Sequence, residues 1–133
     1  MQKLVAVLDA DEKQCTELCA LLGERCYRPI ALHSLPHLVG CIQKTACGVV
    51  IIDIDTVPVD NRIIRDLTNE NPGVIVLCVS QRRVHPELAE TMGCRIYACV
   101  SKPIDPDELF YLLNSLDRNN DGAGPAGPVT DRI

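Results

Sequence analysis

The chain has 133 residues, of which 47% are hydrophobic and 3% aromatic, and its formal net charge is −5. This length suits one domain built on one aliphatic core. The acidic charge and the single basic pair Arg82-Arg83 argue against a nucleic-acid-binding face, which needs clustered Lys and Arg. Because no apolar run approaches the roughly 20 residues of a membrane span, and the first residues lack the order of a signal peptide, we expect a cytoplasmic protein without membrane contact.

Five short segments have the pattern of strands in a parallel sheet. Four are nearly continuous apolar runs rich in β-branched residues, which is typical of strands buried on both faces. The remaining one contains Pro29, which favours a sheet edge, where a missing amide donor is tolerated. In chain order the predicted strands are residues 4–8, 27–32, 49–52, 74–79 and 96–100.

Between and after these strands, apolar residues recur at i, i+3, i+4 and i+7, the spacing of one helix face. The predicted helices contain residues 15–22, 35–42, 63–67, 88–92 and 109–116, the fourth being short and polar. Ser34 is the candidate N-cap of the second helix, and Asp105 followed by Pro106 marks the start of the last. Alternating strands and helices predict a doubly wound five-stranded parallel sheet with helices on both faces.

The composition changes near the end of the chain. Residues 118–133 are polar and rich in Gly and Pro, so they cannot bury enough surface to order themselves. We therefore predict a domain of residues 1–117 followed by a flexible tail or interdomain linker at 118–133, where a longer regulator was cut.

Eight cysteines and three histidines are present, but neither set has the spacing of a metal site. No C-x-x-C pair occurs, and the cysteines lie in periodic apolar segments. We interpret them as small core hydrophobes of a reduced protein, with a metal site or redox switch as the alternative. We place His33, His37 and His85 at the surface or at loop edges.

Polar side chains follow four of the predicted strands. Asp9 follows the first strand, Asp53 the third, Ser80 the fourth and Lys102 the fifth. Ligands of open parallel sheets bind outside the carboxyl ends of the strands, where the strand order reverses. We therefore expect two carboxylates, a hydroxyl and an ammonium to meet in one cleft.

This set of groups fits phosphoryl transfer. Paired carboxylates favour a hard divalent cation such as Mg²⁺, which prefers oxygen ligands. The metal and Lys102 would neutralise the phosphoryl oxygens, while Ser80 donates a hydrogen bond to one of them. Asp53 would then attack phosphorus in line as the nucleophile.

The segments AVLDADE, VVIIDIDTVP, VIVLCVS and VSKPID, in that order, resemble the receiver domain of two-component response regulators over residues 1 to about 117. The resemblance implies a flavodoxin-like receiver fold in which Asp53 is the phosphoacceptor and Asp9 an acid of the metal pocket. It also implies that Ser80 and Lys102 contact the phosphoryl group, that the backbone carbonyl of Asp55 binds the metal, and that the peptide bond before Pro103 is cis.

The chain departs from the family pattern at three places. Ala10 stands where the family usually has a second acid, which would weaken Mg²⁺ binding, and Asp11 comes one residue late and is better read as a helix cap. The loop after Asp53 is also one residue longer before its proline. There Asp55 either compensates for Ala10 or is a solvated loop acid. The family's aromatic switch position is occupied by a non-aromatic residue. Cys99 is at the switch position, and Tyr97 lies two residues earlier, on the same strand face if the strand is regular.

Three functions from different classes follow. The leading hypothesis is a signalling domain, not an enzyme, that takes a phosphoryl group from a histidine kinase or histidine phosphotransfer protein onto Asp53 and switches a partner-binding surface. The second is a degenerate receiver that acts as a phosphorylation-independent dimerisation or docking module. The third is a phosphatase, because Asp53-Ile54-Asp55 also resembles the D-x-D motif of haloacid-dehalogenase-type enzymes.

Overall fold

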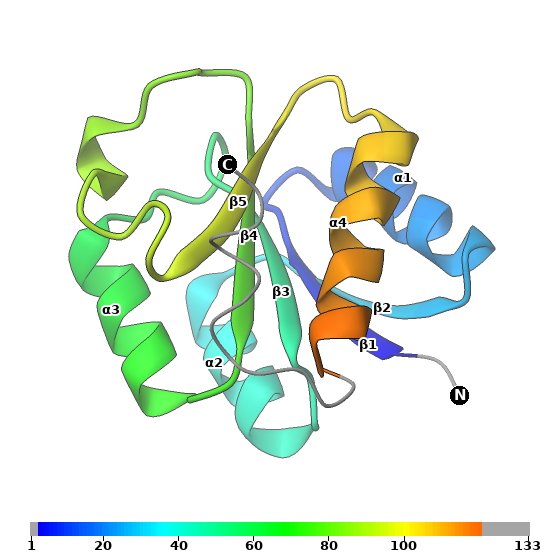
Figure 1. The fold of residues 1–133 in the computed structure, drawn as a ribbon, viewed down its shortest axis with the longest axis horizontal. Coiled ribbons are helices and arrows are strands. Elements are labelled where there is room, and N and C mark those ends of the chain that lie inside the picture. The colour runs from blue at the N-terminus through cyan, green and yellow to red at the C-terminus, as the bar shows by residue number, and fades with distance from the viewer. Residues whose placement is uncertain (1–2, 121–133) are drawn as a thin grey trace.

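The computed structural model describes residues 3–120, and the side chains of residues 3–116. Its centre is a five-stranded sheet, all parallel, in the order β2-β1-β3-β4-β5 (Figure 1). The strands are β1 (Lys3–Leu8), β2 (Tyr27–Leu32), β3 (Val49–Asp53), β4 (Ile75–Ser80) and β5 (Ile96–Ser101). The helices are α1 (Glu12–Glu24), α2 (Leu35–Lys44), α3 (Asn61–Glu70) and α4 (Pro106–Asn120), with a short 3-10 turn η1 (Pro86–Leu88). The predicted fold class is confirmed.

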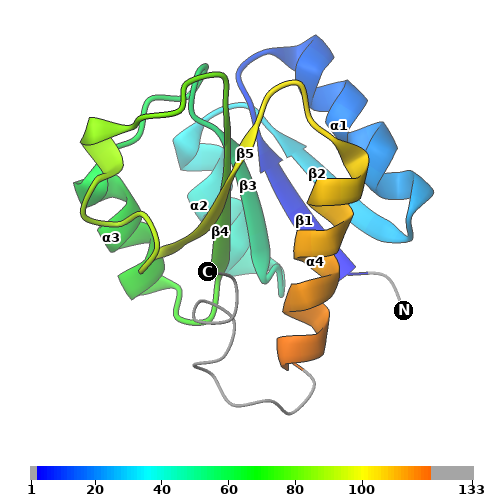
Figure 2. The same cartoon turned by 45° about the horizontal axis from the view of Figure 1, so that its top comes forward.

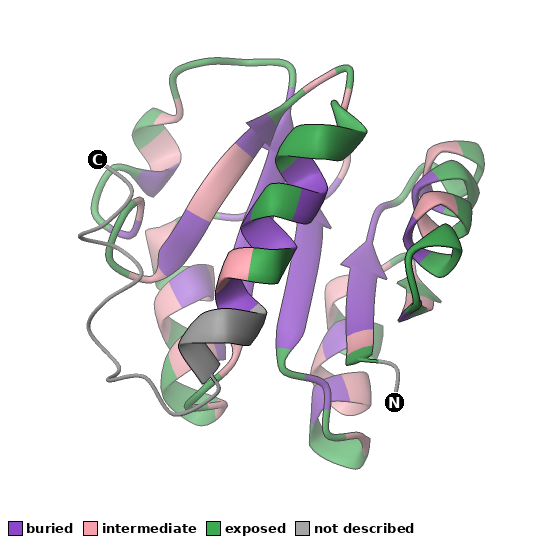
Figure 3. Ribbon diagram, turned by 45° about the vertical axis from the view of Figure 1, so that its right-hand side comes forward, coloured by how far each residue is buried: buried purple, intermediate pink, exposed green. Residues whose placement is uncertain are grey.

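Alternation along the strands creates two apolar layers. In β1, Val5 and Val7 pack with helices α1 and α4, whereas Ala6 and Leu8 pack with α2 and α3. The central strand β3 is buried along its whole length, as the continuous apolar run predicts (Figure 3). Figure 2 shows the helices on the two sides of the sheet. The carboxyl ends of the strands therefore emerge at one edge between the two layers.

Helix starts follow the predicted capping residues. Asp11 is the N-cap of α1 and accepts a hydrogen bond from the Gln14 amide at 3.0 Å, so the capping interpretation is confirmed. Asp105 accepts from the Asp107 amide at 3.0 Å at the start of α4. Ser34 is the N-cap of α2 by backbone, but its hydroxyl makes no cap bond and instead pairs with Nδ1 of His37 at 3.0 Å.

The predicted helix around residues 88–92 is wrong. The chain forms only the 3-10 turn η1 there and then irregular turns up to β5, with Leu88 buried. Gly93 has φ +86°, a left-handed conformation that ends any helix that would continue through it. The three apolar residues of this short polar segment were too few to stabilise a helix there.

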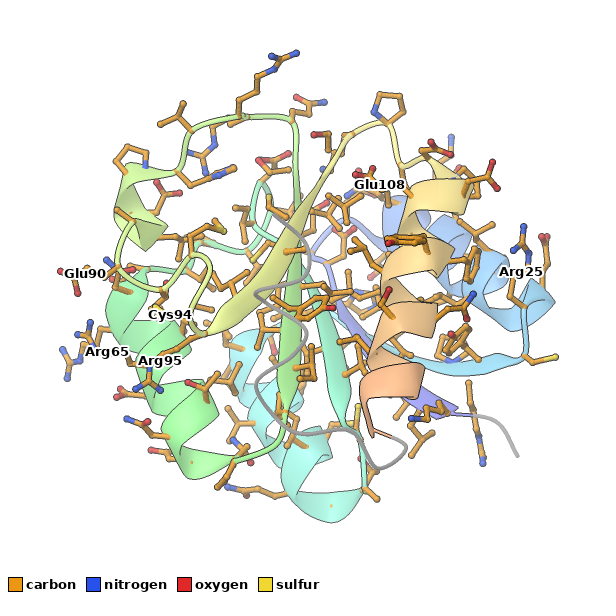
Figure 4. All side chains as sticks on the ribbon, viewed as in Figure 1. Arg25, Arg65, Glu90, Cys94, Arg95 and Glu108 are labelled. Atoms are coloured by element: carbon orange, nitrogen blue, oxygen red, sulfur yellow. The ribbon has the colours of Figure 1, made fainter. Side chains whose placement is uncertain are left out.

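The segment that replaces this helix is fastened to α3. Arg65 pairs with Glu90 at 2.9 Å, and Arg95 donates to Thr68 at 2.9 Å and to Asn69 at 2.8 Å. Figure 4 shows Arg65, Glu90 and Arg95 gathered where this segment meets α3. The segment between β4 and β5 is thus an ordered part of the α2–α3 side of the molecule, despite having almost no helix.

A bulge in β5 corrects the expectation that Tyr97 and Cys99 share a strand face. The pairing of β5 with β4 shifts register, because Val76 faces Ile96 while Leu77 faces Ala98. The extra residue reverses the alternation beyond it. Tyr97 is therefore buried on the α1–α4 side, whereas Cys99 packs against the α2–α3 side.

The cysteines are all free, but their interpretation as core residues holds only in part. Cys15, Cys47 and Cys78 are buried. Cys26 and Cys94 are exposed, and each lies in the turn just before a strand, β2 and β5 respectively. Burial raises the pKa of the Cys15 and Cys78 thiols to about 12. The burial of Cys15, Cys47 and Cys78 thus agrees with the prediction of core cysteines, and the exposure of Cys26 and Cys94 does not.

The last helix extends to Asn120, past the domain boundary that the composition indicated at residue 117. The predicted tail falls mainly on residues 121–133, which lie outside the described residues. Among residues 3–120, no helix combines the length and the apolar composition that crossing a membrane requires.

Candidate functional site

The four residues predicted from strand ends come together at the carboxyl edge of the sheet. Asp9, Asp53 and Ser80 are buried, and the side chain of Lys102 is 13% exposed. The strand order reverses between β1 and β3, so Asp9 and Asp53 lie on either side of the switch point. The central spatial prediction from the sequence is confirmed.

The carboxylate of Asp53 accepts hydrogen bonds at both oxygens. Its Oδ1 accepts from the backbone amides of Asp55 at 2.9 Å and Thr56 at 3.1 Å. Its Oδ2 lies 2.6 Å from Nζ of Lys102 and also accepts from the side-chain amide of Gln14. A buried carboxylate needs such partners, because an unpaired charge away from water is costly.

Asp9 is held by donors from its own loop and from the loop after β3. Its Oδ1 accepts from the Asp11 amide at 2.9 Å and from the Thr56 hydroxyl at 3.0 Å. The same hydroxyl accepts from the amide of Ala10 at 3.1 Å. Thr56 thus joins the two acid-bearing loops, a role that the sequence pattern did not indicate.

Gln14 connects the two buried acids. Its Nε2 donates to Oδ2 of Asp9 at 2.6 Å and to Oδ2 of Asp53, so both of its protons point at carboxylates. Gln14 comes three residues after the N-cap Asp11, in the spacing of a capping box. In that motif the side chain would return to the N-cap amide, but here the Asp11 amide donates to Asp9 and the Gln14 side chain turns into the pocket.

Asp55 also belongs to the site through its side chain. Its Oδ1 accepts from the Ser80 hydroxyl at 2.8 Å, and its Oδ2 accepts from the Gln81 amide at 2.8 Å and lies 3.1 Å from Nζ of Lys102. Partial burial alone would raise the pKa of Asp55, but the hydrogen bonds from Gln81, Ser80 and Lys102 outweigh it and lower that pKa. Asp55 is thus an exposed loop residue, as one alternative had it, but its carboxylate is hydrogen-bonded within the site.

Lys102 is shared between two acids. It is paired with Asp53 and Asp55, and it follows β5 immediately before a cis peptide bond to Pro103, as the resemblance implied. Burial would lower the pKa of Lys102, but its hydrogen bonds to the two carboxylates raise it. The two carboxylates therefore favour the charged form of the Lys102 side chain.

The residues present fit a divalent cation in one arrangement. Within residues 3–120, no three His, Cys, Asp or Glu side chains gather as a metal site. However, Mg²⁺ is often held by only one or two carboxylates and keeps several waters. Asp9 and Asp53 supply such a pair, and the shared contact with one Gln14 nitrogen places both carboxylates within reach of one centre. A cation at that centre would have to displace the Gln14 amide.

A cleft of 570 Å³ adjoins the acids, between α1 and the loop that follows β5. Leu18, Leu21 and Ile104 line it together with Asp53 and Lys102. The site therefore has an open approach from the α1 side of the sheet edge.

The histidines lie outside this constellation of side chains. His33 and His37 are exposed, and His85 is half-buried in the segment before η1. Nδ1 of His33 donates to the backbone carbonyl of Asp9 at 2.8 Å, which supports the loop and not a catalytic dyad. The prediction of surface or loop-edge histidines is confirmed for His33 and His37.

No family model and no curated protein matches the sequence. Solved structures do match. A two-component response regulator from Clostridium difficile has a TM-score of 0.79 at 13% identity, with 90% of this chain and 99% of that one covered. A putative pilus assembly protein (cpaE) from Burkholderia thailandensis has a TM-score of 0.74 at 21% identity, with 88% and 99% covered.

The BeF3-activated DrrB receiver domain matches with a TM-score of 0.73 at 18% identity, covering 89% of this chain and 99% of that one. Identities this low establish the shared fold and leave the chemistry to the residues of this chain. Nearly the whole length of these domains is matched. The chain has the fold of response-regulator receiver domains, which agrees with the resemblance seen in its sequence.

Proposed function

We propose that this receiver-fold domain is the phosphoacceptor of a two-component system and takes a phosphoryl group from phosphohistidine onto Asp53. The partner is a histidine kinase or histidine phosphotransfer protein. The observation that carries the proposal is the contact of Lys102 with Asp53 at 2.6 Å beside the Ser80 hydroxyl, at the switch point of the sheet.

In this reaction an Asp53 oxygen forms a bond to phosphorus as the P–N bond of phosphohistidine breaks. The electron pair of that bond stays on the imidazole nitrogen, and the product is an acyl phosphate on Asp53. The Asp55 and Thr56 amides hold Oδ1 of Asp53, which orients the carboxylate for attack. Lys102 stands where it would balance the added negative charge.

Asp9 and Asp53 would hold Mg²⁺ in this function. A bound Mg²⁺ supplies neutralisation of phosphoryl oxygens in the transition state. Ala10 removes the second acid of the family pattern, so we expect weak Mg²⁺ binding in the free domain. The backbone carbonyl of Asp55 as a further ligand stays a prediction.

The test uses phosphoramidate, which has a P–N bond like that of phosphohistidine, together with Mg²⁺. We expect intact-mass spectrometry to detect one added phosphoryl group on the wild type and none on Asp53→Asn. Asp66→Asn, which removes an exposed acid on α3, is the matched control and should be phosphorylated like the wild type. An unmodified wild type, or an equally modified Asp53→Asn, would refute the proposal.

The second candidate is a docking module that works without phosphorylation. It is favoured by one feature of the pocket: Gln14 donates to both Asp9 and Asp53, so the two acids have a hydrogen-bond donor from the chain itself, and Ala10 adds no further acid. A wild type that stays unmodified with phosphoramidate yet binds its partner would support this candidate. Receiver domains generally are signalling modules and not enzymes. Steady hydrolysis of a generic phosphate ester by this domain would support the phosphatase hypothesis.

A further inference from the structure

Three donors converge on the carboxylate of Asp55, and all of them lie beside the proposed phosphoacceptor. They are the Ser80 hydroxyl at 2.8 Å, the Gln81 amide at 2.8 Å and Nζ of Lys102 at 3.1 Å. A hydroxyl, a backbone amide and an ammonium directed at the two oxygens of one carboxylate make an oxyanion site. In this structure the oxyanion is a side chain of the same domain.

We propose that Asp55 is a resident ligand of this oxyanion site, where it takes the place of the phosphoryl oxygens and must leave before a phosphoryl group or another tetrahedral oxyanion can bind. This inference rests on the proposed function, since it describes how access to that same site is controlled. Asp55 belongs to the loop directly after Asp53, so its carboxylate lies close enough to compete with an oxyanion for the same three donors.

Asp55 is an exposed residue, and its contacts distinguish a resident ligand from an acid that only water solvates. The Asp55 side chain is 21% exposed and uses both oxygens, with Oδ1 on Ser80 and Oδ2 on Gln81 and Lys102. Ser80 is buried and its hydroxyl oxygen also accepts from the Arg82 amide at 3.0 Å, which aims the hydroxyl proton at Asp55. A buried donor aimed in this way needs an acceptor. If the Asp55 carboxylate were removed, the Ser80 hydroxyl would be free to donate to an incoming anion.

Two consequences follow for the domain. The chain holds the Ser80 hydroxyl and Lys102 in contact with an anion before any phosphoryl group arrives, so phosphorylation exchanges one anion for another. The contacts of Ser80 and Lys102 should then change little, and the signal must come mainly from the released Asp55 and its loop.

The first experiment measures anion binding without phosphoryl transfer. In an Asp53→Asn background, inorganic phosphate is titrated into the protein and followed by the backbone amide resonance of Gln81. Adding Asp55→Asn should lower the dissociation constant at least tenfold, about 1.4 kcal/mol, because the competing charge is gone while the side-chain shape is kept. Asp55→Ala is the second variant and guards against an Asn side chain that still accepts from Ser80.

Glu17→Gln in the same background is the matched control, because Glu17 is exposed and lines the same cleft without contacting the three donors. It removes an equal charge nearby and should leave the dissociation constant within about twofold. Equal phosphate affinities with and without Asp55 would overturn the inference, as would a Glu17→Gln effect as large as that of Asp55→Asn.

A second experiment separates this inference from the proposed function. Phosphoramidate phosphorylation of Asp53 is compared in the wild type and in Asp55→Asn, each with Asp53 intact. Faster modification of Asp55→Asn supports both ideas. If the wild type and the variant are modified equally fast, the proposed function stands and the inference fails. If neither is modified, the proposed function fails, and the phosphate titration alone decides whether Asp55 occupies an oxyanion site.

Discussion

Replacing Gln14 by Met should raise the affinity of the pocket for Mg²⁺. The Gln14 amide donates to Asp9 and Asp53, and a cation between these carboxylates must break both bonds. Met is close to Gln in length and in helix propensity, so the variant removes the donor and leaves α1 intact. A second variant, Gln14→Ala, removes the side chain from the pocket altogether.

The size of the effect follows from two opposing terms. A hydrogen bond to a charged group contributes about 1.5 kcal/mol net at the low end, so the two bonds contribute about 3 kcal/mol. Releasing the side chain returns about 1.5 kcal/mol of rotamer freedom. The remaining 1.5 kcal/mol or so corresponds to about a tenfold lower dissociation constant for Mg²⁺ in the variant.

The assay is a titration of Mg²⁺ followed by calorimetry and by the amide resonances of the loops after β1 and β3. In the wild type, the side-chain NH₂ resonances of Gln14 should also move towards solvated values as the metal enters. Gln43→Met, the same change at an exposed position on α2, is the control and should bind like the wild type. Equal affinities of Gln14→Met and the wild type, or an unmoved Gln14 side-chain signal at saturation, would refute the reasoning.

Four further results are expected. Ala10→Asp should tighten Mg²⁺ binding about tenfold by calorimetry, because position 10 is exposed beside Asp9 and the new acid adds a ligand; an unchanged dissociation constant would mean that position 10 does not face the cation. The pKa of Asp55 is lowered below its ordinary 3.8, so its contribution to stability is present above pH 3.8 and is lost as the pH falls through the folded-state value. The free energy of unfolding, measured with urea at a series of acidic pH values, should therefore fall less steeply in Asp55→Asn than in the wild type. Iodoacetamide at neutral pH should modify the exposed Cys94 long before the buried Cys78, whose pKa of about 12 leaves almost no thiolate. Equal rates of modification in peptide mass spectrometry would show that Cys78 is not buried. Arg95→Ala should lower the unfolding free energy by about 1 kcal/mol and speed amide exchange in residues 86–95, because it removes the hydrogen bonds to α3; unchanged exchange would show that other contacts hold this segment.

The parts of the fold that the sequence predicted are those set by local periodicity. A strand buried on both faces, such as β3, has no polar residue until its end, and the polar residue there must lie at the sheet edge. Asp53 and Lys102 could therefore be placed in one cleft without coordinates. The start of α1 was also predictable, because Asp11 is followed by regular helical spacing.

Most of the parts that failed depend on contacts between positions far apart in the sequence. The bulge at Tyr97 is a matter of how β5 pairs with β4, and no single-strand pattern contains it. The fourth helix was expected from the spacing of Leu88, Ala89 and Met92, but the adjacent Gly93 and the anchoring of Arg95 to α3 favour turns instead. Gln14 was not identified because its spacing is that of an ordinary capping box, and only the nearby acids draw its amide away.

Gln14 and Asp55 belong to one network and not to two separate features. Asp53 contacts both Gln14 and Lys102 through the same oxygen, and Lys102 contacts both Asp53 and Asp55. A cation that displaces Gln14 would weaken the hold of Asp53 on Lys102, because the two positive centres would share one carboxylate oxygen. Lys102 would then be freer to follow an entering oxyanion, so cation and anion would each favour the other's binding. A neutral amide and a shared ammonium thus supply the three carboxylates with donors that ions would otherwise provide.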